Sequence, residues 1–181
     1  MRKGDWCQTF TGLQFWPLDP RPEEICIEDI AHALALTCRF NGHCRCFYSV
    51  AQHSYLVSQE CGVLDPDWSP IVQLWGLLHD AAEAYIGDMV RPLKRDMPAF
   101  KDAERAIMRA VCTRFDLPMD EPAIVKHADN ILLATEARDL MGAPPVPWMP
   151  LPEPLPFHIA PASPDMAERM FLSMFKGLRE E

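Results

Sequence analysis

The stretch that decides the fold is Leu74-Trp75-Gly76-Leu77-Leu78-His79-Asp80-Ala81-Ala82-Glu83-Ala84-Tyr85-Ile86-Gly87-Asp88. Its first half is almost entirely apolar, which predicts a buried helix because no face of it favours contact with water. At about 3.6 residues per turn, His79 and Glu83 lie one above the other, and Asp80 lies about 100° round the axis. A buried carboxylate without a partner costs several kcal/mol. These side chains therefore need a partner, and a divalent metal ion would serve.

The composition indicates a single domain, residues 1–181, of a soluble globular protein. The chain has 181 residues, enough for a sizeable core, and 49% of them are hydrophobic, which argues against extended disorder. The formal net charge of −9 argues against stable binding to nucleic acid or to an anionic membrane. A small anionic substrate is still compatible with this charge if the few Arg and Lys side chains gather at one site.

Three features predict a cytoplasmic protein. Residues 1–10 lack the apolar segment of a signal peptide, so we expect no export signal. No stretch approaches the roughly 18 consecutive apolar residues of a membrane span. The seven cysteines are odd in number and irregularly spaced, which favours reduced thiols over a disulfide framework.

Hydrophobic periodicity predicts an all-α fold of five to six main helices. The expected helices span residues 27–38, 50–60, 69–86, 98–115, 122–141 and 165–180. Ser49 opens a capping box for the second helix, and Cys61-Gly62 is expected to end it. We expect loops over residues 39–47 and over Arg91-Pro92-Leu93-Lys94.

Two other segments are distinctive. Residues 6–17 carry aromatic residues, threonines and Gly12, which is typical of a short hairpin or an ordered arm. Residues 142–164 contain nine prolines, so they cannot form a helix, yet they are too apolar for a solvated linker. We expect an extended strap that lies over the domain or over a partner subunit. The apolar strap and the last helix predict a homo-oligomer, unless that helix packs on its own core through Met166, Met170, Phe171, Met174 and Phe175.

Four residues stand on predicted helices among apolar neighbours, namely His53, His79, Asp80 and Asp129. Imidazole and carboxylate ligands suit Zn, Mn, Fe, Co or Ni, and the lack of thiolate disfavours a structural zinc site. Taken alone, His53 is equally compatible with a satisfied core histidine, and Asp129 with an ion pair to Lys126 or Arg138. The helix at 122–141 nevertheless points Asp129 toward aliphatic neighbours, because its inner face reads Val125, Asp129, Leu132, Leu133 and Glu136.

The order His…His-Asp…Asp resembles the signature of HD-domain metal-dependent phosphohydrolases, which are helical bundles. Further segments are similar to motifs of the bacterial 5′-deoxynucleotidases within that superfamily, and the layout also resembles the small bacteriophage HD-domain dATP triphosphohydrolases. These segments are Arg39-Phe40, Val50-Ala51-Gln52-His53-Ser54, His79-Asp80-Ala81-Ala82-Glu83, Gly87-Asp88, Pro92-Leu93-Lys94 and Lys126-His127-Ala128-Asp129. They cover roughly residues 39–140 and leave out the N-terminal arm and the strap.

The resemblance implies a role for each matching position. The metal ligands would be His53, His79, Asp80 and Asp129. The catalytic carboxylates would be Glu83 and Asp88, which orient or deprotonate water or protonate the leaving oxygen. Arg39 would clamp phosphate with its planar guanidinium, and Lys94 would assist. Phe40 is the best candidate for stacking on a base, and His43 on the same loop is a weaker candidate for substrate binding.

The activity implied by the resemblance is hydrolysis of a deoxynucleotide with the help of one divalent transition metal. Zn, Mn and Co are the preferred candidates for this metal, and Mg is a candidate accessory ion. Similarity to the phage enzymes favours dATP as the substrate, with deoxyadenosine and triphosphate as the products. It also implies that the enzyme works in the cytoplasm of a bacterium or of a phage-infected host cell. The main alternative is a 5′-deoxynucleotidase acting on deoxynucleoside monophosphates. A catalytically silent HD module is a further alternative, and a cyclic-nucleotide phosphodiesterase is disfavoured because the chain has no Gly-Tyr-Pro motif.

A second metal site is the remaining alternative. Cys38, His43, Cys44 and Cys46 form a small Cys/His cluster, which a structural zinc could in principle use. The spacing is not that of a zinc finger, and Cys is often simply a small buried apolar residue. The sequence therefore favours thiols without a metal.

Overall fold

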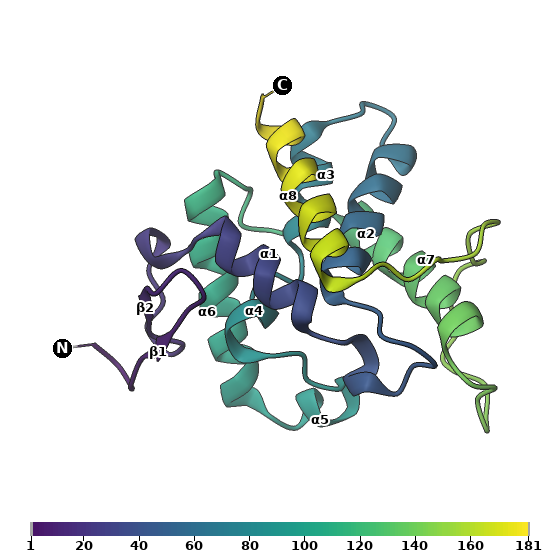
Figure 1. The fold of residues 1–181 in the computed structure, drawn as a ribbon, viewed down its shortest axis with the longest axis horizontal. Coiled ribbons are helices and arrows are strands. Elements are labelled where there is room, and N and C mark those ends of the chain that lie inside the picture. The colour runs from purple at the N-terminus through teal and green to yellow at the C-terminus, as the bar shows by residue number, and fades with distance from the viewer. Residues whose placement is uncertain (1, 181) are drawn as a thin grey trace.

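Six helices of nine residues or more build the fold in a computed structural model that describes residues 2–180 (Figure 1). They are α1 (Ile27–Leu36), α2 (Val50–Leu64), α3 (Pro70–Leu78), α6 (Pro98–Phe115), α7 (Ala123–Leu140) and α8 (Pro164–Glu180). Two short helices, α4 (Glu83–Ile86) and α5 (Arg91–Arg95), follow α3, and 3₁₀ turns occupy Pro22–Glu24 and Arg39–Gly42. The all-α prediction is confirmed.

The hairpin predicted within residues 6–17 is present as β1 (Cys7–Gln8) and β2 (Gln14–Phe15), which pair antiparallel. It packs on the helical body through Phe15, whose buried ring stacks on Tyr85 with 4.1 Å between ring centroids. Thr11 adds a polar link, because its amide and its hydroxyl both donate to the carboxylate of Asp29 on α1.

Helices α2 and α3 form a tightly packed central pair. A Cβ atom on Gly76 would lie 2.8 Å from Cys61 Sγ and 3.1 Å from Ser58 Cα, so only glycine permits this approach. On α2, a Cβ atom at Gly62 would meet the Gln73 side chain at 2.9 Å. The prediction that Cys61-Gly62 ends the second helix is therefore wrong, since Gly62 serves close packing and α2 continues to Leu64.

The prediction of one continuous helix over 69–86 is also wrong, because α3 ends at Leu78. The His79 ring donates from Nδ1 to the carbonyl of Gly76 (2.8 Å), the acceptor that the next helical turn would use. The backbone then tightens to i→i+3 bonds, from Ala81 N to Leu78 O and from Glu83 N to Asp80 O, both 2.9 Å. Residues 91–95, expected to be loop, form α5 with Pro92 in its first turn.

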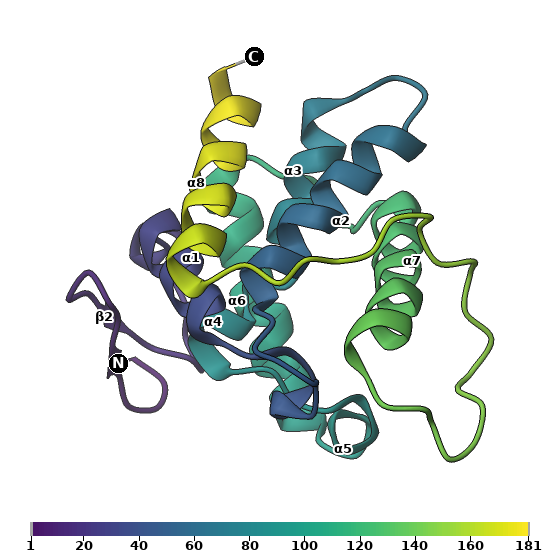
Figure 2. The same cartoon turned by 45° about the vertical axis from the view of Figure 1, so that its right-hand side comes forward.

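The last helix, α8, lies against α1, α2 and α3 (Figures 1 and 2). Ala167 and Phe171 are its buried residues, and Met170, Met174 and Phe175 are half-buried. Met166 was predicted on this buried face, but it is 46% exposed because the face is centred on Ala167 and Phe171. Helix α8 thus packs mainly on the core of its own chain.

The proline-rich strap leaves the end of α7, arches outward and returns along α7 before entering α8 (Figure 2). Arg138 on α7 donates to the carbonyls of Leu155 (2.7 Å) and Phe157 (2.6 Å). Asp139 accepts from the amide of Ile159 (2.9 Å), and Gln52 on α2 bonds the backbone of Ala160 and Ala162. The second half of the strap is thereby fixed to its own domain. Among residues 2–180, no helix is long and apolar enough to cross a membrane.

Candidate metal centre

Three of the four predicted ligands converge at the junction of α2 and α3. His53 lies on α2, and His79 and Asp80 follow the last residue of α3. His79 Nε2 lies 3.3 Å from both His53 Nε2 and Asp80 Oδ2, and His53 Nε2 lies 3.7 Å from Asp80 Oδ2. One ligand atom from each residue lies within 4.8 Å of the other two, so this largely buried cluster could hold a metal ion.

The partners of the two imidazole rings define which nitrogens face the cluster. His53 Nδ1 donates to the buried carboxylate of Glu136 at 2.6 Å, and His79 Nδ1 donates to the carbonyl of Gly76 at 2.8 Å. Because both Nδ1 atoms act as donors, each neutral ring carries its lone pair on Nε2. Two lone pairs thus face each other beside a carboxylate, which is the arrangement that a bound cation requires.

The electrostatics of the cluster also favour a positive charge. Burial alone would lower the pKa of His79, but the Asp80 carboxylate, assisted by Asp129 and the Gly76 carbonyl, raises it to about 9. Partial burial would raise the pKa of the Asp80 carboxyl, yet His79, His53 and Arg39 hold it well below the usual range. In the absence of metal, the centre therefore draws a proton onto His79.

Asp129, the fourth predicted ligand, reaches the same place from α7. Its Oδ1 lies 3.4 Å from His53 Nε2, and its Oδ2 accepts from Lys126 Nζ at 2.5 Å. Burial would raise the pKa of Asp129, but the contact with His53 and the charges of His79 and Lys126 lower it. The structure thus places Asp129 beside the cluster and also forms the ion pair with Lys126 that the sequence left open. Its role as a ligand stays a prediction.

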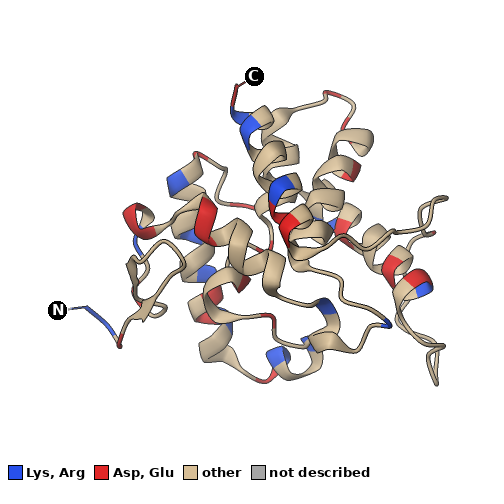
Figure 3. Cartoon of the chain, viewed as in Figure 1, with Lys and Arg blue, Asp and Glu red and all other residues tan. Residues whose placement is uncertain are grey.

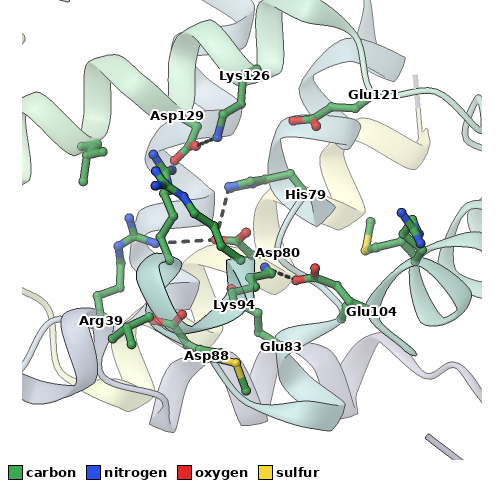
Figure 4. A pocket seen from close by; sticks show the side chains of 18 of the residues that line it. Arg39, His79, Asp80, Glu83, Asp88, Lys94, Glu104, Glu121, Lys126 and Asp129 are labelled. Carbon is green, nitrogen blue, oxygen red and sulfur yellow. Dashed lines mark hydrogen bonds and ion pairs between the residues drawn. The ribbon is translucent and has the colours of Figure 1, made fainter. Parts of the chain in front are cut away.

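Glu83 and Asp88, the predicted catalytic carboxylates, both line the same cavity as His79 and Asp80 (Figure 4). Glu83 Oε2 is buried and has no hydrogen-bond partner among residues 2–180. Burial and the neighbouring Asp80 and Asp88 charges raise the pKa of Glu83 well above its ordinary value. Burial and Asp80 also raise the pKa of Asp88, although Arg39 and Lys94 oppose this effect. A buried carboxyl with a raised pKa and a partner-free oxygen is suited to acid–base chemistry.

The cavity has a volume of about 800 Å³ and is lined mainly by α3–α7 and by the strap. Of the predicted substrate-binding residues, Arg39, Phe40 and Lys94 line it, whereas the side chain of His43 is exposed and lies outside it. Lys94 forms an ion pair with Glu104, as Figure 4 shows. From the strap, Trp148 and Met149 reach the wall, and the Trp148 ring lies 6.5 Å from that of Phe40.

Several lining or supporting residues were missed at the sequence level. Glu104 lies on an amphipathic helix, Glu121 on the connection between α6 and α7, and Trp148 on the apolar strap, and none of these local patterns reveals a site. Glu136 had a usable signal, because a carboxylate seven residues after Asp129 falls on the same inner face of α7. The contacts of Arg39 were not predicted either, since its guanidinium pairs with the carboxylates of both Glu136 (3.0 Å) and Asp80 (3.5 Å).

Two aromatic residues near the cluster, Trp75 and Tyr85, and the cysteines of the Cys/His cluster take structural positions. Trp75 is buried in the core and donates from Nε1 to the carbonyl of Pro118, although its edge touches the cavity. Tyr85 stacks on Phe15 and does not line the cavity. Cys38 Sγ and Cys44 Sγ lie 3.6 Å apart. In the part of the chain that the structure describes, the group with metal-binding geometry is His53, His79 and Asp80, and no cysteine belongs to it.

Two relatives are similar to this chain over most of its length. The protein described as "Uncharacterized protein YfdR" from Escherichia coli (strain K12) is 38% identical over 177 residues, which cover 96% of this chain and 95% of the relative. "Uncharacterized protein RCAP_rcc00048" from Rhodobacter capsulatus is 37% identical over 147 residues, covering 77% and 75% respectively. No family model matches the chain.

Proposed function

We propose that this chain, which belongs to the family of the Escherichia coli protein YfdR, is a metal-dependent phosphohydrolase that acts on deoxynucleotides. One observation carries the proposal: two Nε2 atoms and a carboxylate converge at the floor of a cavity that also holds the unpartnered carboxyl of Glu83. This arrangement joins a metal centre to a proton-transfer group. The HD-type motifs in the sequence support the same reading.

The metal that these residues suit is Zn, Mn or Co, because two imidazoles and one or two carboxylates form a mixed N/O ligand set without thiolate. The fit has a physical basis, since Nε2 atoms of two neutral rings 3.3 Å apart repel one another unless a cation or proton lies between them. A divalent ion bound there supplies Lewis acidity and lowers the pKa of water. His53, His79, Asp80 and, we propose, Asp129 would hold it.

The side chains around the cluster would transfer protons and position water and substrate. Glu83 would give its proton to the leaving oxygen or, once ionised, take one from the attacking water. Asp88, whose carboxyl is influenced by the charges of Arg39 and Lys94, would orient water or substrate. Arg39 would bind a phosphoryl oxygen while it keeps Asp80 in place, since its guanidinium already reaches that carboxylate.

The number of cations around the cavity supports a triphosphate rather than a monophosphate as the proposed substrate. Its Lys and Arg residues are Arg39, Arg91, Lys94, Arg95, Arg105 and Lys126. Arg91 and Arg95 are exposed residues of α5, whose Lys and Arg residues are blue in Figure 3, and a substrate with three phosphates would use more of these cations than a monophosphate. We therefore propose a deoxynucleoside triphosphate triphosphohydrolase, with dATP as the first substrate to test, that works in the cytoplasm and without nucleic acid.

The decisive experiment is an incubation of the purified protein with each dNTP and each dNMP, with Mn²⁺, Co²⁺, Zn²⁺ or Mg²⁺ added separately. Release of deoxynucleoside and inorganic triphosphate from dATP is the expected result. Release of phosphate from monophosphates alone would replace it with the 5′-deoxynucleotidase alternative. If no nucleoside forms from any of these compounds, the chain is not a nucleotide hydrolase, and a binding module becomes the better interpretation.

A further inference from the structure

The carboxylate of Glu136 lies behind the candidate metal centre and contacts two of its residues at once. It is fully buried on α7. Oε1 accepts from His53 Nδ1 at 2.6 Å, and Oε2 accepts from Arg39 Nε at 3.1 Å and lies 3.0 Å from Arg39 Nη2. Glu136 is not among the residues that line the cavity, and its side chain has no contact with solvent.

These contacts require Glu136 to be ionised. Both carboxylate oxygens face donors, Oε1 the Nδ1 of His53 and Oε2 the guanidinium of Arg39, so neither oxygen has an acceptor for a proton of its own. An ionised carboxylate only accepts hydrogen bonds, so it holds the ring proton of His53 on Nδ1. The lone pair of Nε2 is then directed toward His79 and Asp80.

The second carboxylate oxygen of Glu136, Oε2, positions the guanidinium of Arg39. Arg39 lies on the 3₁₀ turn Arg39–Gly42, where the next two residues, Phe40 and Asn41, have left-handed backbone angles with φ of 55° and 50°. The guanidinium is held on one side by Glu136 and reaches Asp80 Oδ2 on the other at 3.5 Å. Glu136 thus sets the position of the cation that faces the cavity.

We propose that Glu136 is a positioning residue that links metal binding to phosphate binding, because one carboxylate fixes both His53 and Arg39. This inference rests on the proposed function, in which His53 binds the metal and Arg39 binds the phosphate. The competing interpretation is a buried ion pair that serves stability alone. The two interpretations differ in what happens to metal affinity and to anion affinity when the fold is retained.

Glu136→Gln separates them, because an amide cannot serve both partners. If its oxygen accepts from His53, its NH₂ group faces the Arg39 donors; in the reverse orientation, the NH₂ group drives the proton of His53 onto Nε2. The matched control is Glu168→Gln. Glu168 also contacts a histidine Nδ1, that of His32 at 3.1 Å, but this pair lies at a partly exposed contact between α8 and α1, away from the cavity.

Three measurements are needed on the wild-type chain, the E136Q variant and the E168Q variant. They are the affinity for Co²⁺ with its visible absorption spectrum, the affinity of the Co²⁺-loaded protein for inorganic tripolyphosphate, and the circular dichroism spectrum. We expect E136Q to weaken Co²⁺ binding about 10- to 100-fold, as removal of an outer carboxylate partner of a histidine ligand does. Its Co²⁺ spectrum should change and its tripolyphosphate affinity should fall, whereas E168Q should match the wild type.

If the E136Q variant does not fold, a second pair of variants tests the same inference. Arg39→Met combined with Glu136→Gln removes both charges, so no unpaired guanidinium is left in the core. It is compared with Arg39→Met alone, in which Glu136 still holds His53. Weaker Co²⁺ binding in the double variant than in the single one supports the inference, and equal affinity overturns it.

The outcomes separate this inference from the proposed function. Wild-type Co²⁺ affinity, spectrum and tripolyphosphate affinity in folded E136Q would overturn the positioning role and leave the hydrolase proposal intact. Weakened Co²⁺ and tripolyphosphate binding in E136Q, in a protein that hydrolyses no nucleotide, would support the positioning role and overturn the hydrolase. A wild-type chain that binds no Co²⁺ would overturn both.

Discussion

His53 Nε2 faces His79 Nε2 at 3.3 Å, although His53 lies on α2 and His79 directly follows α3. On its other side, each ring donates a hydrogen bond from Nδ1, His53 to Glu136 and His79 to the carbonyl of Gly76. Neither ring can turn away without breaking its Nδ1 bond. The pair is thus preorganised for a cation, and the predictions below test what occupies and surrounds this centre.

Asp80→Ala should abolish metal binding and hydrolysis while the fold is retained. Asp80 is partly exposed at the cavity floor, so its removal leaves no large void, but it takes away the carboxylate that faces both Nε2 atoms. Several kcal/mol of transition-state stabilisation depend on a catalytic metal, so turnover should fall at least about 100-fold. Cobalt titration and nucleotide assays measure this, with Asp102→Ala on the exposed face of α6 as the control. Unchanged cobalt affinity in Asp80→Ala would contradict the assignment.

The stability of the metal-free protein should fall between about pH 6.5 and pH 9. The pKa of His79 is about 9 in the fold against an ordinary 6.5, so the folded state binds this proton more tightly than the unfolded state does. The contribution is complete below pH 6.5 and is lost as the pH rises through 9. Thermal unfolding in a chelator, followed across this range, measures it. His79→Gln should remove most of the dependence, and a wild-type Tm that rises with pH would refute it.

Arg138→Ala should loosen the strap without changing the metal centre. The variant loses the hydrogen bonds that the Arg138 guanidinium donates to the carbonyls of Leu155 and Phe157. Trp148 and Met149 would then no longer be held against the cavity wall. Limited proteolysis within residues 143–158 should accelerate, and KM for nucleotide should rise while cobalt affinity stays constant. Arg169→Ala on α8 is the control, and equal proteolysis in the two variants would count against the anchoring role.

Gly76→Ala should destabilise the fold, whereas Gly177→Ala should not. A Cβ atom at Gly76 would meet Cys61 Sγ at 2.8 Å and the Ser58 backbone at 3.1 Å, and such overpacking costs about 1–3 kcal/mol. At Gly177 on α8 a Cβ atom would meet nothing within 4 Å, so alanine should gain up to about 1 kcal/mol of helix propensity. Denaturant unfolding of both variants measures the difference. Equal midpoints would contradict the tight packing of α2 on α3.

The helix pattern was largely readable because each amphipathic segment carries its own periodicity. The bounds of α6 (Pro98–Phe115) were predicted to the residue, since Pro98 opens the helix and its apolar face repeats regularly to Phe115. The break after Leu78 was not predicted, because it depends on the His79 ring taking a backbone carbonyl. Similarly, Cys61-Gly62 was interpreted as a helix end, since nothing local reveals that Gln73 packs against Gly62.

The sequence by itself determined the helical class and the types of group at the centre. Burying His53, His79, Asp80 and Asp129 among apolar neighbours already requires that they find partners, and their order along the chain indicated a metal. Only the tertiary structure decided the geometry around them: that Glu136 joins His53 to Arg39, that His43 points away, and that the strap brings Trp148 to the cavity. The physical reason is that a local sequence pattern is informative only within its own helix. Periodicity reports which face of a helix is buried, whereas contacts between residues up to about a hundred positions apart depend on how the helices pack.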